Sequence, residues 1–422
     1  MIGHSETTSY TSRRAGRPLA LSGGTPLMKK PTNYFGVGCM HTISELTRSI
    51  YQTVPAASAL LSSRGAQSDS WSAPAHSCHV GASQPDLACD RQQPFVPIPP
   101  ASSLSAFTGE AHGKVILLGE HAVVYGAPAV ALAVPTATCR ATALLGDRPG
   151  RGLTSLCVRT PDPGGRYTEL TASPSMHALV ATALERADRT QATSVDLLLE
   201  SNIPPGRGLG SSAASARAVA ASLNHLLDLR LGPQDLFDLV QSAERLTHGR
   251  SSGIDAHATG QSGLVVLNQG RMAVPVTARQ GWVVVADSGT SGSTHQAVEM
   301  LNGLFTHSPF LQRDFLGRST VLTADGLDAL AAGQLERLGH RLTETHTLLT
   351  ELGLVTAKVH GLVDTALSGG ALGAKMTGGG LGGCAIALAG SRAQADELAA
   401  HLRAHGATRT WLAPLLAEGC DQ

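Results

Sequence analysis

The 422-residue sequence predicts an α+β protein with two domains that meet at a cleft. Strand-like and helix-like runs alternate irregularly from Phe107 onward, and no internal repeat is visible. A second unit begins near Gly281, where a new apolar run starts. Glycine-rich stretches separate strands from helices in both units, which is typical of backbone that a ligand approaches closely.

The first hundred residues differ from the rest. They are rich in Ser, Thr, Gly, Pro and Gln and end in the proline-rich run "QQPFVPIPPASS". Such a composition buries too little apolar surface to offset the entropy cost of ordering. We therefore expect a disordered extension over residues 1–102, with no assigned function, followed by domains at 103–280 and 281–422.

The first domain is expected to open with two paired strands and a loop in "GKVILLGEHAVVYGAPAVALAV". Further elements follow from apolar periodicity and from end signals. They are a helix at 173–187 capped by Ser173 or Ser175, a strand at 194–201, a helix at 213–227, a helix at 232–249 stopped by Gly249, and a hairpin at 262–276 turning at "NQG".

The second domain is expected to begin with the strand "GWVVVADSG" and to continue as long helices to about Asp364. The run "GGALGAKMTGGGLGGCAIALAG" is interpreted as a glycine-rich turn that leads into a buried strand. A helix at 391–406 and a closing strand at 408–415 complete the chain.

Composition narrows the possible partners. Acidic and basic residues balance at 32 each, so no global field favours nucleic acid or an anionic membrane. The seven cysteines are odd in number and form no C-x-x-C pair, which argues against disulfides or zinc and favours a reducing cytoplasm. No apolar run approaches the roughly 20 residues of a membrane span, and none follows Arg13 and Arg14 as in a secretory signal.

The stretch "IPPGRGLGSSAAS" joins a strand to a helix through glycines. It is not a Walker A loop, because Ser211 and not lysine follows Gly210. A dinucleotide-type glycine pattern starting at Gly208 is matched only weakly. The amides of Gly210, Ser211 and Ser212 would point from a helix start toward an anion. An ordinary helix cap made of small residues explains the stretch equally well.

Lys114, Glu120 and His121 lie close together in "HGKVILLGEHAVVYG". The chain has only five lysines, so a lysine heading an apolar strand is notable, although a solvated strand end is the simpler explanation. Glu120 and His121 follow a buried strand, in a loop position where polar side chains often line clefts.

Glu244 and Asp255 lie in "AERLTHGRSSGIDAHATG". Together they could bind a metal and activate a hydroxyl, although a lone helical glutamate usually faces solvent. The neighbouring His248 and His257 fit no zinc spacing and are interpreted as structural. The last motif, "KMTGGGLGGC", is expected to be a closely approached loop, because apolar strand follows it directly and a flexible linker would not sit there.

Three segments, "GKVILLGEHAVVYG", "PPGRGLGSSAA" and "KMTGGGLGGC", resemble the motifs of the GHMP kinases (galacto-, homoserine, mevalonate and phosphomevalonate kinases) and occur in the family's order. The resemblance covers residues 107 to 420, and "GEHAVVYG" and "ERLTHGRSSGID" are most similar to the mevalonate-phosphorylating branch. One departure is His112, where proline commonly precedes Gly113; it should alter the strand entry and not the chemistry.

The resemblance implies an N-terminal, ATP-binding domain like ribosomal protein S5 domain 2, a ferredoxin-like C-terminal domain, and an active site in the cleft between them. It implies an ATP- and Mg²⁺-dependent kinase that phosphorylates the 5-hydroxyl of mevalonate in the mevalonate pathway of isoprenoid biosynthesis. A homodimer is consistent with the family, whereas neither a nucleic-acid partner nor a membrane partner is expected.

The resemblance also implies a role for each matching residue. The nucleotide would contact Lys114, Ser201, Pro205, Gly206, Arg207, Gly208, Leu209, Gly210, Ser211 and Ser212. Ser212 and Glu244 would hold magnesium, Glu120, His121, Thr294 and Gly379 would face mevalonate, and Asp255 and Lys114 would be catalytic.

These roles suit phosphoryl transfer, which needs positioning and positive charge more than covalent chemistry. Asp255 would take or merely orient the hydroxyl proton, and the sequence leaves both open. Another GHMP kinase acting on phosphomevalonate or homoserine is an alternative, although no basic cluster near Glu120 or Thr294 favours a phosphorylated acceptor. The intact set of Lys114, Ser212, Glu244 and Asp255 argues against a non-catalytic nucleotide-binding module.

Overall fold

The computed structural model describes residues 107–146, 152–159, 167–189, 193–248, 251–268, 275–276 and 281–415. The extension expected at 1–102, the helix stop at Gly249 and most of the hairpin turn at 268–270 lie outside the described residues.

The first sheet is built around β1 (Phe107–Leu118) and β2 (Ala129–Leu145), which pair antiparallel as predicted. The loop between them contains the short 3-10 helix η2 (Ala122–Tyr125). The strand order is β4-β3-β5-β2-β6-β7, with β1 also paired to β2. The remaining strands are β3 (Gly152–Arg159), β4 (Tyr167–Glu169), β5 (Ser194–Ser201), β6 (Leu264–Leu267) and β7 (Pro275–Val276).

Strands β5 and β6 were predicted, and β6 and β7 pair antiparallel as expected of the hairpin. Strands β3 and β4 were missed. They lie at one side of the sheet, where β3 pairs parallel with β5 and antiparallel with β4. Edge strands such as β4 carry little of the apolar alternation that identifies a strand in sequence.

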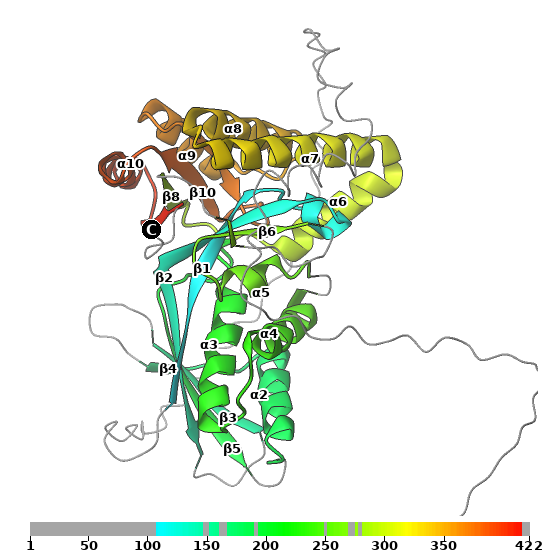
Figure 1. Ribbon diagram of the computed structural model, residues 1–422, viewed down its shortest axis with the longest axis vertical. Helices are drawn as coiled ribbons and strands as arrows, with labels where there is room; N and C mark the ends of the chain where they lie inside the picture. Colours follow the sequence, from blue (N-terminus) through cyan, green and yellow to red (C-terminus); the bar gives the residue numbers. More distant parts are fainter. Residues whose placement is uncertain are drawn as a thin grey trace, which may run out of the picture. The chain divides into compact units, whose positions relative to one another are not determined.

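Helices α2 (Pro174–Arg186), α3 (Ser211–Leu226), α4 (Pro233–His248) and α5 (Ile254–Ala258) lie beside this sheet (Figure 1). The predicted cap of α2 is confirmed, because the Ser173 hydroxyl accepts from the amide of Met176. Helix α3 packs directly on β1 and β2. A Cβ on Gly109 would lie 2.2 Å from the carbonyl oxygen of Ala218, so the alanine-rich helix and the strand approach to backbone contact.

The second sheet has the order β11-β8-β10-β9 and is antiparallel throughout. Numbered within this unit, the strands run 4-1-3-2, which is the predicted ferredoxin-like arrangement. The strands are β8 (Trp282–Asp287), β9 (Gly373–Thr377), β10 (Cys384–Ala389) and β11 (Arg409–Pro414). The helices are α6 (Thr294–His307), α7 (Pro309–Ala332), α8 (Leu335–Glu351), α9 (Ala357–Ser368) and α10 (Arg392–Ala404).

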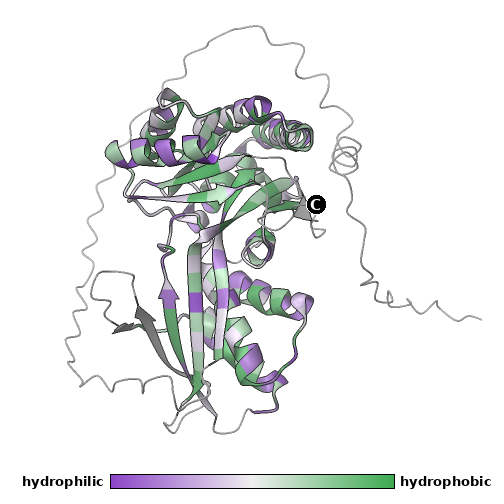
Figure 2. Cartoon of the chain, turned by 60° about the vertical axis from the view of Figure 1, so that its left-hand side comes forward, coloured by the Kyte–Doolittle hydropathy of each residue, from purple (hydrophilic) through white to green (hydrophobic). Residues whose placement is uncertain are grey.

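The two halves share one hydrophobic core. Val285 and Ile386 of the second sheet belong to the same buried cluster as Val115 and Leu132 of the first. The intervening residues of the second sheet, such as Val284, belong to a separate cluster with α6 to α10. Both faces of this sheet are therefore apolar, as the green strands of Figure 2 show. Extensive apolar burial of this kind holds the halves together.

Strand β9 is an edge strand that α8 covers. A Cβ on Gly373 would lie 2.0 Å from the carbonyl oxygen of Gly339, so helix and strand meet where neither has a side chain. The Thr343 hydroxyl accepts from the amide of Ala374 at 3.4 Å, and Nδ1 of His346 accepts from the amide of Met376 at 3.2 Å. The outward amides of this edge are thus satisfied from α8.

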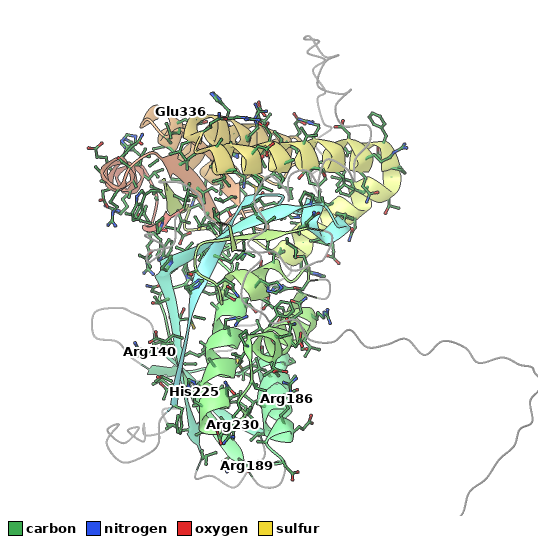
Figure 3. All side chains as sticks on the ribbon, viewed as in Figure 1. Arg140, Arg186, Arg189, His225, Arg230 and Glu336 are labelled. Carbon is green, nitrogen blue, oxygen red and sulfur yellow. The ribbon has the colours of Figure 1, made fainter. Side chains whose placement is uncertain are left out.

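Several basic side chains lie beside β2, α2 and the end of α3, in the lower part of Figure 3. Arg140 pairs with Glu110 at 2.6 Å and Arg230 with Asp228 at 3.1 Å. Exposed pairs of this kind contribute little to stability. No helix in the described part of the chain has the length and apolar character needed to cross a bilayer.

Candidate active site

A cavity of about 1210 Å³, its open mouth included, lies where the two halves meet. Its walls come from β1, the loop before α3, and helices α3, α4 and α5 on one side. The start of α6 and the loop after β9 form the other side. The predicted site residues that line it are Lys114, Glu120, His121, Pro205, Gly206, Gly208, Gly210, Ser211, Ser212, Glu244, Asp255, Thr294 and Gly379.

The glycine loop before α3 leads the chain into the helix at Ser211. Gly206, Gly208 and Gly210 have φ of 70°, 77° and 70°, a region that favours glycine. A Cβ on Gly210 would lie 2.9 Å from Cε of Lys114, so this glycine also makes room for the lysine. Gly210, Ser211 and Ser212 at the start of α3 line the cavity, and backbone amides at a helix start suit an anion.

The third glycine-rich motif is closely approached, as predicted. A Cβ on Gly378 would lie 2.7 Å from Cα of Gly208, and both residues have positive φ. The amide of Gly292 donates to the carbonyl of Gly206 at 2.8 Å. The loop that approaches the third motif is therefore the glycine loop before α3, and the two loops are in contact at the cavity wall.

Three residues expected to contact the nucleotide do not line the cavity. Arg207 turns to the second half, where its guanidinium lies 3.1 Å from Asp287 and donates to Ser291 and to the carbonyl of Gly289. Leu209 is buried and accepts from the amide of Lys114. The Ser201 hydroxyl accepts from the amide of Ile203 at 3.1 Å. Their nucleotide contacts remain predictions.

Lys114 and Asp255 form an ion pair at the cavity wall. Nζ of Lys114 lies 3.1 Å from Oδ1 of Asp255 and donates to the carbonyl of Gly208 at 3.2 Å. The lysine side chain is 4% exposed and the aspartate 32%, so the lysine is not a solvated strand end. An ammonium held beside a partly open carboxylate can stabilise negative charge on an oxygen bound between them.

Ser212 and Glu244 lie together on α3 and α4. The Ser212 hydroxyl donates to Oε1 of Glu244 at 2.6 Å, and Glu244 is buried. Burial, together with the negative charge of Asp255, raises the pKa of Glu244 to about 7. A buried carboxylate and a hydroxyl at a cavity wall are hard oxygen donors, and a divalent cation there would stabilise the charged form.

Glu120, His121, Thr294 and Gly379 form a further part of the cavity wall. Nε2 of His121 donates to the carbonyl of Gly379 at 3.1 Å, and burial lowers the pKa of His121 to about 4, so the ring is neutral at pH 7. A Cβ on Gly379 would lie 2.4 Å from the Thr294 hydroxyl, which places these two residues in contact. Glu120 pairs with Lys375.

The chain is similar in sequence to known kinases. Residues 177–263 match the family model for the GHMP kinases N terminal domain, and residues 327–408 match the model for GHMP kinases C terminal. The mevalonate kinase of Pyrococcus horikoshii is 33% identical over 299 residues, which cover 67% of this chain and 88% of that protein. The chain belongs to the GHMP kinase family.

Two further relatives of this GHMP kinase are informative. The mevalonate kinase of Aeropyrum pernix is 33% identical over 296 residues, covering 67% of this chain and 88% of that protein. The crystal structure of L. major mevalonate kinase in complex with R-mevalonate has a TM-score of 0.61 and 25% identity, covering 76% of this chain and 98% of that one. As a member of this family, the enzyme uses ATP as its phosphoryl donor.

The kinase site also contains residues whose position the sequence did not reveal. His248 was interpreted as structural from the sequence, but it lines the cavity, and its Nε2 lies 3.7 Å from Glu244. The spacing of four residues on one helix could have indicated that His248 lies beside Glu244. His257 stacks on Phe237 at 3.9 Å between ring centroids, in agreement with a structural role. No cluster of three or more His, Cys, Asp or Glu suited to a metal occurs among the described residues.

Proposed function

We propose that this kinase transfers the γ-phosphoryl group of ATP to the 5-hydroxyl of mevalonate, giving 5-phosphomevalonate and ADP. The similarity to several mevalonate kinases supports the acceptor. The observation that carries the proposal is the Lys114–Asp255 pair at 3.1 Å, because both residues line the cavity shared by the glycine loop and the Glu120 end.

The donor side is suited to the ATP phosphates. The amides at the start of α3 and the ammonium of Lys114 supply positive charge without a Walker A lysine. Ser212 and Glu244 would hold Mg²⁺ through their hydroxyl and carboxylate oxygens. When bound, Mg²⁺ would neutralise part of the phosphate charge.

The acceptor side is suited to a primary alcohol. As the 5-oxygen forms its bond to the γ-phosphorus, the bond from that phosphorus to the leaving ADP oxygen breaks. Asp255 is open enough to orient the hydroxyl and to receive its proton, while Lys114 stabilises the charge that develops on the oxygen.

An unphosphorylated acceptor is favoured by the charges of the cavity. Among the described residues that line it, Lys114 is the one lysine or arginine, and it is already paired with Asp255. A phosphorylated acceptor would bring further negative charge beside Glu120 without a matching cation. This balance supports mevalonate over phosphomevalonate.

The test is turnover of ATP-Mg²⁺ with a panel of R-mevalonate, phosphomevalonate, homoserine and galactose, measured as ADP release with product mass. We expect turnover of mevalonate. Turnover of another alcohol without mevalonate would refute the acceptor, and ATP binding without any turnover would indicate a non-catalytic module. The expected homodimer is tested by light scattering, and the expected cytoplasmic location by cell fractionation.

A further inference from the structure

A second lysine–carboxylate pair lies behind the acceptor end of the cavity. Lys375 of β9 and Glu120 of the loop after β1 are in direct contact, with side chains 0% and 1% exposed. Nζ of Lys375 also donates to the carbonyl of Met376 at 2.7 Å and to that of Ile116 at 3.3 Å. The ammonium thus has three acceptors, matching its three protons.

Only one oxygen of Glu120 takes part in this pair. Oε1 accepts from Lys375, whereas Oε2 is buried and has no hydrogen-bond partner among the described residues. A buried charged oxygen without a donor is costly, so a hydrogen-bond donor from a bound molecule would stabilise Oε2. Glu120 lines the cavity and Lys375 does not, so the ligand reaches Glu120 alone.

The two charges depend on each other. Burial raises the pKa of Glu120 and lowers the pKa of Lys375, and each effect is opposed by the partner's charge. Removing the ammonium would leave the carboxylate in a site that strongly favours its neutral form. A neutral carboxyl group is a weaker acceptor than a carboxylate.

The reacting hydroxyl already has its partners in Lys114 and Asp255, which leaves Glu120 for a second polar group of the acceptor. Mevalonate carries such a group as its 3-hydroxyl. We infer that Lys375 is a positioning residue, which holds Glu120 so that its free oxygen Oε2 accepts a hydrogen bond from the 3-hydroxyl of mevalonate. This inference rests on the proposed function.

Three other titratable groups lie near the Lys375–Glu120 pair, and the two histidines among them do not change charge in the pH range of the experiments below. Lys114 on β1 faces Glu120. His121, in the loop after β1, and His346, on α8, face Lys375. Burial lowers the pKa of both histidines to about 4, so they are neutral between pH 6 and 9. Lys114 is retained in every variant described below.

The first experiment compares Lys375→Met with Lys358→Met, which removes an exposed lysine on α9. At pH 7, K375M should raise the KM for mevalonate roughly 10- to 100-fold, the worth of a hydrogen bond to a charged group. The kcat and the KM for ATP should stay close to wild type. Raising the pH to 9 should recover part of the KM in K375M alone, because Glu120 regains its charge.

An unchanged KM for mevalonate in folded K375M would overturn the inference. So would an equal loss in every kinetic constant without pH recovery, since that is the signature of general structural damage. If K375M does not fold, Glu120→Gln with and without Lys375→Met provides the test, because the double variant removes both buried charges of this pair. The KM of the double variant for mevalonate should equal that of E120Q, and a further tenfold rise in this KM would overturn the inference.

A substrate lacking the 3-hydroxyl, 5-hydroxy-3-methylpentanoate, tests the assigned contact. Wild type should lose affinity for it relative to mevalonate, whereas E120Q should discriminate far less between the two. Equal discrimination by wild type and E120Q would contradict the contact.

One readout separates this inference from the proposed function. Carbon-13 NMR of glutamate carboxyl groups, with the Glu120 signal assigned by its loss in E120Q, should show a higher ionisation pH in K375M than in wild type. Wild type that fails to phosphorylate mevalonate would refute the function. An unchanged Glu120 titration in K375M would instead refute the role of Lys375.

Discussion

The molecule uses the same two chemical groups, a lysine ammonium and a carboxylate, in two pairs beside one cavity. Lys114 and Asp255 meet where the carboxylate is partly open, whereas Lys375 and Glu120 meet out of contact with solvent. An open carboxylate can exchange a proton with a bound hydroxyl. A buried one cannot shed its charge without losing its partner, so it is suited to holding a fixed hydrogen bond.

The pairs also differ in what they join. Lys114 and Asp255 both belong to the first half, on β1 and α5. Glu120 and Lys375 belong to different halves and are 255 residues apart. The first pair therefore joins two elements within one half, while the second joins the two halves.

Removing the carboxylate of the Lys114–Asp255 pair should have the largest effect on activity. Asp255→Ala should lower kcat by about 10²- to 10⁴-fold, the usual worth of a general base, while ATP affinity measured by calorimetry stays near wild type. Asp255→Asn separates the two roles: near-native activity would show that Asp255 only orients the hydroxyl. Asp364→Ala, an exposed change on α9, is the matched control. Full activity of D255A would contradict the mechanism.

Replacing Glu244 tests whether this carboxylate, which lies close enough to Asp255 to feel its charge, binds a cation. Glu244→Gln should lower activity at low Mg²⁺ by roughly 10- to 100-fold and be partly rescued at high Mg²⁺, because one ligand is weakened. Glu336→Gln on α8, labelled in Figure 3, is the exposed control. A Mg²⁺ dependence identical to wild type would exclude Glu244 as a ligand.

Replacing Arg207 tests whether the contacts of the glycine loop with the second half support ATP binding. Arg207→Ala should raise the KM for ATP about tenfold, since charge-assisted bonds to Asp287 and neighbouring oxygens are lost. Arg207→Lys should recover little, because lysine lacks the fork that contacts several oxygens at once. Selective loss of ATP affinity with an unchanged melting temperature would instead support a direct nucleotide contact.

The smallest expected effect is the contribution of the buried histidines to the pH dependence of stability. Burial lowers the pKa of His121, His257 and His346 to about 4, from an ordinary value of 6.5. The unfolded chain therefore binds more protons between pH 6.5 and 4, so stability should be full above pH 6.5 and fall as the pH drops through this window. Calorimetry should show a shallower fall between pH 6.5 and 5 for His257→Phe, but not for the exposed His307→Gln. Equal slopes would contradict the assignment.

Sequence patterns predicted the parts of the site that are local. The glycine loop, Lys114, Glu244 and Asp255 each lie in a short motif, and most elements around them carry clear apolar periodicity. Strand β9 was not recognised, because its five residues lie in a glycine-rich run that was interpreted as a turn leading into β10. The partners of Lys375 and Arg207 could not be read from the chain, since both contacts cross between the halves.

The uniform burial of β9 gives Lys375 a consequence for folding. Ala374 and Met376 face the helix-side cluster, while Lys375 faces β1. Side chains alternate along a strand, so a slip of one residue would place the ammonium among apolar side chains and leave Glu120 without a counterion. The apolar contacts of Ala374 and Met376 and the ion pair of Lys375 are therefore satisfied in the same alignment of the second sheet, and both are lost in the shifted one.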